Sequence, residues 1–82
     1  MGILRWLFGV AGGDGSSASQ AIVVASIGDE YAWIQRHCPG FRLEMQSLAE
    51  IDGKPYDVMS LQNAQGDKRT VYFDISRFFG KL

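Results

Sequence analysis

The chain has 82 residues, of which 46% are hydrophobic and 12% aromatic, and its formal net charge at pH 7 is −1. This length fits one small domain, and the aromatic content is higher than disordered chains carry, so we expect a folded core. Lys and Arg are balanced by Asp and Glu, which excludes a cationic platform and argues against nucleic acid as a partner.

The cysteine content points to a reducing compartment. Cys38 is the only cysteine, so the chain cannot form an internal disulfide bond. We therefore expect a cytoplasmic protein, with the periphery of a membrane as an alternative location.

The chain begins with an apolar segment, residues 1–11, followed by a Gly- and Ser-rich linker, residues 12–20. If the segment is helical, with a rotation of 100° per residue, it has one wide apolar side. Arg5 is its only Lys or Arg. Ten helical residues reach about 15 Å, half of a hydrocarbon core of about 30 Å, so the segment cannot cross a bilayer. The candidate interaction residues here are Ile3, Leu4, Trp6, Leu7 and Phe8.

Three roles for this segment remain open at the level of sequence. Its side chains dock on an open face of the domain or of a second copy, or they contact a membrane surface or another protein, or they stay disordered. A single Arg gives weak attraction to anionic lipid, about 1 kcal/mol, so a membrane contact would be reversible. The glycines of the linker lack a following Gly-Lys-Ser or Gly-Lys-Thr, which favours a flexible tether over a phosphate-binding loop.

A short strand and one helix are expected next. Ala21 to Ala25 is a β-branched apolar run, and Ser26 with Asp29 three residues later predicts a helix N-terminus. Pro39-Gly40 ends the helix. Its predicted buried stripe has the spacing i, i+4, i+7 and i+11 and consists of Ile27, Tyr31, Ile34 and Cys38.

A competing interpretation makes residues 17–37 one long helix. Gly28 and the β-branched residues 22–24 are poor choices for a helix interior, which weighs against it.

The block from Phe41 to Ser76 predicts an antiparallel meander of three strands. In the first strand Phe41, Leu43 and Met45 alternate with polar residues, which predicts that these three share one buried face. Asp52-Gly53 is typical of a two-residue type I′ hairpin. In the second run, apolar residues occupy both odd and even positions, as in a strand that is covered on both faces, which suggests a central strand. These strand runs are residues 41–46, 56–62 and 71–76.

The sequence therefore predicts an α+β domain over residues 21–82, in the order strand, helix, strand, strand, strand. One helix packs on a three- or four-stranded, mainly antiparallel sheet, and whether Ala21–Ala25 joins that sheet stays open. Phe78 and Phe79 close the domain; we expect one to cap the core and the other to be exposed as a further candidate interaction residue.

No residue pattern specifies catalysis. His37 and Cys38 are the only His and the only Cys, but adjacent helical side chains diverge, so they are interpreted as a surface residue and a core residue. Two such residues fall short of the four ligands of a closed zinc site. The carboxylates on or beside strands are interpreted as a solvated face; they are Glu44, Glu50, Asp52, Asp57 and Asp74. We expect no catalytic residue, no cofactor and no metal.

The leading hypothesis is a non-enzymatic interaction module whose apolar N-terminal segment contacts a partner protein, a membrane surface or its own copy. Two alternatives remain. The first is a small enzyme or ligand-binding protein that uses His37, Cys38 or the strand carboxylates. The second is a structural homodimer paired through edge strands.

Overall fold

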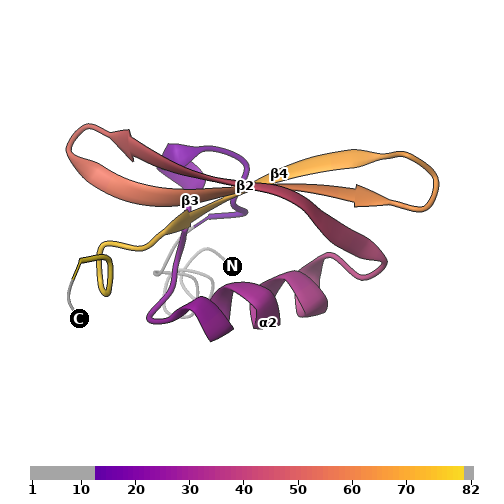
Figure 1. The fold of residues 1–82 in the computed structure, drawn as a ribbon, viewed down its shortest axis with the longest axis horizontal. Coiled ribbons are helices and arrows are strands. Elements are labelled where there is room, and N and C mark those ends of the chain that lie inside the picture. The colour runs from indigo at the N-terminus through magenta and orange to yellow at the C-terminus, as the bar shows by residue number, and fades with distance from the viewer. Residues whose placement is uncertain (1–12, 81–82) are drawn as a thin grey trace, which may run out of the picture.

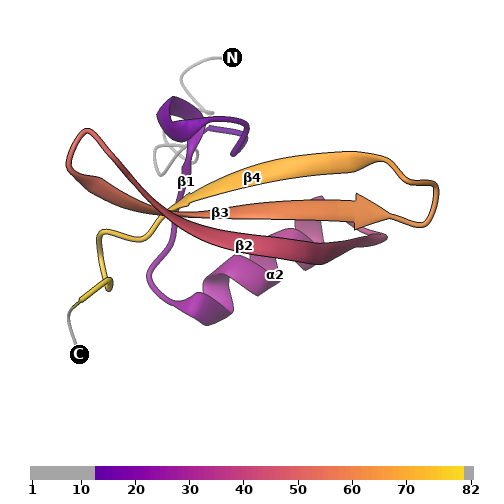
Figure 2. The same cartoon turned by 45° about the horizontal axis from the view of Figure 1, so that its top comes forward.

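The computed structural model describes residues 13–80 of the chain. One helix lies along one side of a twisted sheet (Figure 1), and the long strands run side by side above it in the turned view of Figure 2. The sheet order is β1-β4-β3-β2, with β1 parallel to β4 and the other pairs antiparallel. The predicted α+β fold is confirmed. The elements are η1 (Ala18–Gln20), β1 (Ile22–Val23), α2 (Ile27–His37), β2 (Phe41–Ile51), β3 (Lys54–Asn63) and β4 (Lys68–Asp74).

Local chemistry sets the ends of α2. The Ser26 hydroxyl accepts a hydrogen bond from the Asp29 backbone N–H at 3.2 Å, and the Asp29 carboxylate accepts one from the Ala25 N–H at 3.1 Å. The first bond satisfies an N–H group of the first turn that has no intrahelical partner, and the second ties the residue before the cap to the helix. The helix stops before Gly40, whose φ is 85°. The alternative of one helix over residues 17–37 is wrong, because the chain there forms η1 and β1 before α2 begins.

The β2–β3 hairpin turns at Asp52-Gly53 as predicted. Both residues have positive φ, 53° and 78°, which is the geometry of a type I′ turn. The second predicted strand is central, since β3 pairs with β2 on one side and with β4 on the other.

The predicted buried face of the first meander strand is wrong at Leu43, which is 38% exposed, and at Met45. Leu43 pairs with Leu61, but Met45 pairs with Ser60, so Glu44 is an extra residue that forms a β-bulge. The bulge shifts the alternation by one residue. Met45 therefore leaves the face of Leu43 and is 61% exposed.

The core lies between α2 and the strands β3 and β4. The Trp33 ring meets Phe73 edge-on, with centroids 5.7 Å apart. Phe78 packs against this core while Phe79 is exposed, as the sequence predicts for the pair. The buried cluster consists of Val24, Ile34, Cys38, Met59, Leu61, Val71, Phe73 and Ile75.

The helical stripe predicted to be buried is wrong in its first half. Ile34 and Cys38 are buried, but Ile27 and Tyr31 are exposed. The buried residue in the first turns is Glu30 instead. The helix reaches its apolar partners on β3 and β4 through its later turns, so apolar side chains in its first turns meet no core.

Residues before β1 attach to the edge of β4. The Gly15 carbonyl accepts a hydrogen bond from the Tyr72 N–H at 2.7 Å, and the Gly15 N–H donates to the Gln20 carbonyl at 2.6 Å. From Gly15 onward the Gly- and Ser-rich stretch is therefore joined to the sheet. The apolar segment of residues 1–11 lies outside the described residues.

Candidate interaction surface

An uncovered apolar surface runs between α2 and the edge strand β2, and we call it the α2–β2 face. Leu43 and Leu48 stand opposite Leu61 and Asp57 of β3 in the register. Directly opposed residues share one side of a sheet, so both leucines are on the side that carries the helix. Even so, Leu48 is 59% exposed. The exposed large hydrophobic residues of the face are Ile27, Tyr31, Leu43, Leu48 and Phe79.

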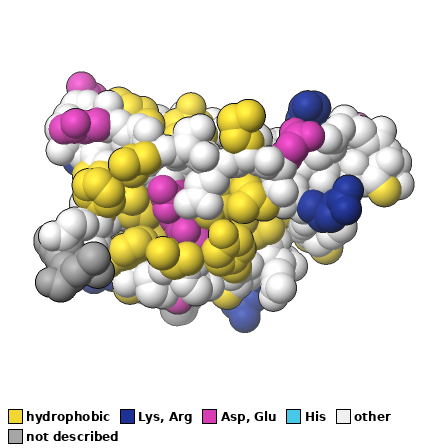
Figure 3. All heavy atoms as spheres, viewed as in Figure 1, with side chains coloured by type: hydrophobic (Ala, Val, Ile, Leu, Met, Phe, Trp, Pro, Cys, Tyr) yellow, Lys and Arg dark blue, Asp and Glu magenta, His cyan; other side chains and the backbone are white. Residues whose placement is uncertain are grey.

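The position of the helix explains why this surface is open. The core contacts of α2 are with β3 and β4, and β2 extends beyond them as the free edge of the sheet. Figure 3 shows a broad area of hydrophobic side chains on the side of the molecule seen in Figure 1, with acidic atoms in its middle. Contiguous apolar surface of this kind marks interaction sites in soluble proteins.

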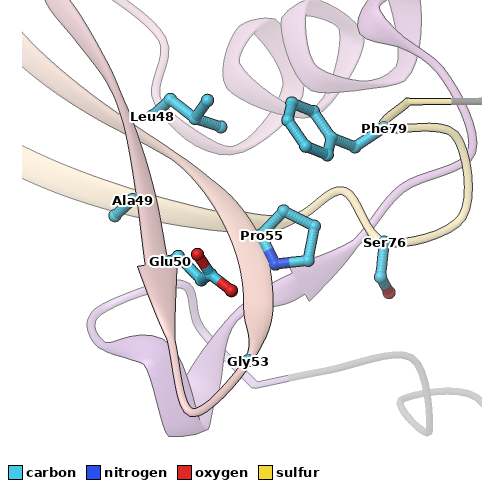
Figure 4. A pocket seen from close by; sticks show the side chains of 7 residues that line it. All are labelled: Leu48, Ala49, Glu50, Gly53, Pro55, Ser76 and Phe79. Atoms are coloured by element: carbon cyan, nitrogen blue, oxygen red, sulfur yellow. The ribbon is translucent and has the colours of Figure 1, made fainter.

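One end of the face is hollowed into a pocket of about 340 Å³. In Figure 4 the Phe79 ring and the Leu48 side chain point toward one another across the space, with Pro55 beside them. A pocket of this size is at the lower end of those that hold small ligands, and it admits one or two apolar side chains. The complete lining is Leu48, Ala49, Glu50, Gly53, Pro55, Ser76 and Phe79.

Two buried carboxyl groups lie beneath the face. Glu30 is fully buried, and neither of its carboxyl oxygens makes a hydrogen bond of acceptable geometry with any residue from 13 to 80. Asp57 is 8% exposed and comes from the central strand. Burial first, and the neighbouring Asp57 carboxyl second, raise the pKa of Glu30 to about 8. With nothing else bound, the Glu30 side chain is therefore protonated at neutral pH.

The other carboxylates have ordinary structural partners. Asp74 accepts hydrogen bonds from the backbone N–H and hydroxyl of Ser76 at 2.9 and 2.6 Å, and Lys54 Nζ lies 3.0 Å from its other oxygen. Burial acts to raise the pKa of Asp74, but the bonds from Ser76 and Lys54 outweigh it and hold that pKa below its usual value. Glu44 lies 3.4 Å from Lys68 at the surface.

The structure separates His37 from Cys38. His37 is exposed and its ring stacks on Trp33 with centroids 4.4 Å apart, while Cys38 is buried in the core. The two side chains do not share a site. A second hollow of about 300 Å³, between β1 and α2, includes His37 and Trp33.

Among residues 13–80 no three His, Cys, Asp or Glu side chains come together as a metal site. Within the same residues no helix is long and apolar enough to cross a membrane. The candidate residues Phe78 and Phe79 are divided between core and surface, and the candidates Ile3, Leu4, Trp6, Leu7 and Phe8 lie outside the described part of the chain.

No protein-family model, curated protein or solved structure matches this chain. Function therefore has to be argued from the site itself.

No residue pattern pointed directly to the α2–β2 face. Leu43 and Leu48 have opposite parity in the sequence, and only the bulge at Glu44 brings them to one side. Glu30 is in the first turn of α2, where an acidic side chain usually faces solvent. A signal that helps in retrospect is its position three residues after Ile27 and four before Ile34, on the apolar stripe itself.

Proposed function

We propose that this chain is a non-enzymatic interaction module that binds an apolar protein segment on the α2–β2 face. The observation that carries the proposal is the pair of apolar walls left uncovered on adjoining elements, Ile27 and Tyr31 on α2 and Leu43 and Leu48 on β2. Hydrophobic grooves lined by large apolar side chains are a recurrent way to bind a short peptide segment.

Two further features support a peptide over a small molecule as the occupant. The pocket beside Phe79 is open at the end of the face, so it fits as an anchor for one side chain of a longer segment. The adjoining edge of β2 carries backbone groups with no strand beside them among the described residues. An extended peptide can add hydrogen bonds there.

The test is selection from a displayed library of ten-residue peptides against the full-length protein. We expect enrichment of apolar peptides whose binding is lost in Leu48→Asp, because a carboxylate there faces the bound segment. The matched control is Met45→Asp on the same strand, where the side chain is equally exposed but lies on the opposite side of the sheet.

Failure to enrich any peptide with either the full-length protein or its Arg5→Gln variant contradicts the proposal. So does an equal loss of binding in Leu48→Asp and Met45→Asp. Two further measurements on the same variants test a second copy of the chain and a lipid surface as alternative occupants. They are light scattering and liposome flotation. A dimer that dissociates only in Leu48→Asp assigns the face to a second copy. Flotation that only Leu48→Asp abolishes assigns it to a lipid surface.

A further inference from the structure

The carboxyl group of Glu30 is the one buried side-chain polar group without a hydrogen-bond partner in residues 13–80. Burying a carboxyl group without partners costs several kcal/mol, so such groups in native structures call for an explanation. Its ionisable neighbour Asp57 is also acidic and acts, after burial, to raise the pKa of Glu30. Two carboxyl groups together form a site that favours a cation.

The surroundings of the two carboxyl groups are those of the α2–β2 face. Glu30 lies on the same side of α2 as Ile27, which precedes it by three residues. Asp57 stands opposite Leu48 in the β2–β3 register. The acidic pair is thus bordered by exposed apolar side chains on both elements. An occupant that matches these features is an apolar segment with one cationic side chain near its middle.

Three of the described cations have partners other than the two carboxyl groups. Lys54 pairs with Asp74, Lys68 with Glu44, and an Arg69 guanidinium nitrogen lies 3.5 Å from the His37 carbonyl oxygen. Among residues 13–80, Asp57 is the only charged group that acts on Glu30.

The chain itself contains a matching segment. Residues 1–10 are almost entirely apolar, and their only Lys or Arg is Arg5, which stands between Leu4 and Trp6. We infer that residues 1–10 dock on the α2–β2 face of the same molecule, with the Arg5 guanidinium bound between the carboxyl groups of Glu30 and Asp57. This inference rests on the proposed function of the face and names its occupant.

The covalent connection permits docking within one molecule. The described chain is fixed to the sheet at Gly15 by the hydrogen bond from Tyr72. Arg5 lies ten positions before Gly15, and ten residue-to-residue steps span up to about 35 Å when the chain is extended. The principal extents of the protein are 37 × 34 × 22 Å, so the segment can pass from the β4 edge to the α2–β2 face. A tether of this length gives effective concentrations in the millimolar range, which favours this occupant over a second copy.

The test is a ¹³C NMR titration of the Glu30 side-chain carboxyl group in the full-length protein and in Arg5→Gln. An opposite charge within about 4–6 Å lowers the pKa of a carboxyl group by about 1–3 units. Glu30 is therefore expected to titrate about 1–3 pH units higher in Arg5→Gln than in the parent protein. Equal midpoints in the two proteins overturn the inference.

The matched control is Lys81→Gln, because Lys81 follows two residues after Phe79 of the face and is the other Lys or Arg outside the described residues. We expect no change in the Glu30 midpoint in this variant. A rise in Lys81→Gln without one in Arg5→Gln assigns the cation to Lys81 and overturns the inference. So does a dimer in light scattering that becomes monomeric in Arg5→Gln, because it places the segment on a second copy.

A peptide obtained in the selection above separates this inference from the proposed function. A docked segment competes with the peptide, so its affinity should rise about tenfold or more in Arg5→Gln as the face opens. Peptide binding that depends on Leu48 but is unchanged in Arg5→Gln leaves the proposed function standing and refutes docking of residues 1–10. Peptide binding that is unchanged in Leu48→Asp refutes both the proposed function of the face and the docking of residues 1–10 on it.

Discussion

Replacement of Gly15 by alanine tests how the N-terminal stretch is fixed to the sheet. Gly15 has a φ of 82°, and a Cβ built there would lie 2.9 Å from Cγ1 of Val71 and 3.5 Å from Cγ1 of Ile22. The left-handed conformation costs an L-residue about 1–2 kcal/mol. Overpacking against a buried strand costs about 1–3 kcal/mol more. Gly15→Ala should therefore lower the free energy of unfolding by about 2–5 kcal/mol.

That loss is large for this domain, because about 0.05–0.15 kcal/mol per residue predicts a total stability of about 4–12 kcal/mol. The assay is equilibrium unfolding in urea, followed by tryptophan fluorescence. Gly53→Ala is the matched control, since Gly53 also has a positive φ, 78°, but no atom lies within 4 Å of a Cβ there. It should show only the conformational cost, about 1–2 kcal/mol.

Equal losses in the two variants would refute the contact between Gly15 and the sheet. A second measurement isolates that contact. If the Cβ meets Val71, then adding Val71→Ala to Gly15→Ala should cost less than the sum of the two single changes, because the smaller side chain relieves the overlap. Strict additivity would show that the two positions do not touch.

Three further changes have defined outcomes. Because the pKa of Asp74 in the folded protein is lower than its value of 3.8 in the unfolded chain, the ionised carboxylate stabilises the fold at pH values above 3.8, and this stabilisation is lost as the pH falls below 3.8. Asp74→Asn should therefore lower the free energy of unfolding at pH 7 by about 1–3 kcal/mol. In acid unfolding curves it should also flatten the loss of stability between pH 5 and 2. A parent and a variant with parallel acid profiles would contradict this assignment. Ser26→Ala should cost about 1 kcal/mol in urea unfolding through loss of the bond to the Asp29 N–H, while Ser47→Ala, at an exposed site in β2, should change little. Cys38, which is 2% exposed, should react with a thiol reagent only after urea has unfolded the domain, and rapid modification of the native protein would place it at the surface.

Features governed by neighbouring residues were predictable from the sequence. The Ser26 cap, the Asp52-Gly53 turn and the end of the helix before Gly40 depend on chemistry within four residues, and all three agree with the structure. The alternation of apolar residues also sufficed for the meander, because the side-chain period of a strand is a local property.

Features that depend on distant contacts were not predictable. Glu30 satisfies the local rule for an acid near a helix N-terminus, yet the sheet packed against α2 buries it. Gly15 belongs to a run whose composition is that of a linker, and only the unpaired edge of β4 makes it a bonded position. The β-bulge at Glu44 has no residue type that distinguishes it from a regular strand position. The composition of the strand therefore did not indicate that Leu48 would lie on the same side of the sheet as Leu43.

The bulge at Glu44 also bears on how the protein stays in solution. A long, regular edge strand is a template for uncontrolled addition of further strands, which leads to fibrils. In β2 the extra residue interrupts the ladder and changes the alternation partway along, so a second regular strand can match the part before Glu44 or the part after it but not both. Deletion of Glu44 would restore an even edge along β2. With Glu44 present, regular pairing along this edge is limited to a short stretch, which hinders the growth of an extended sheet.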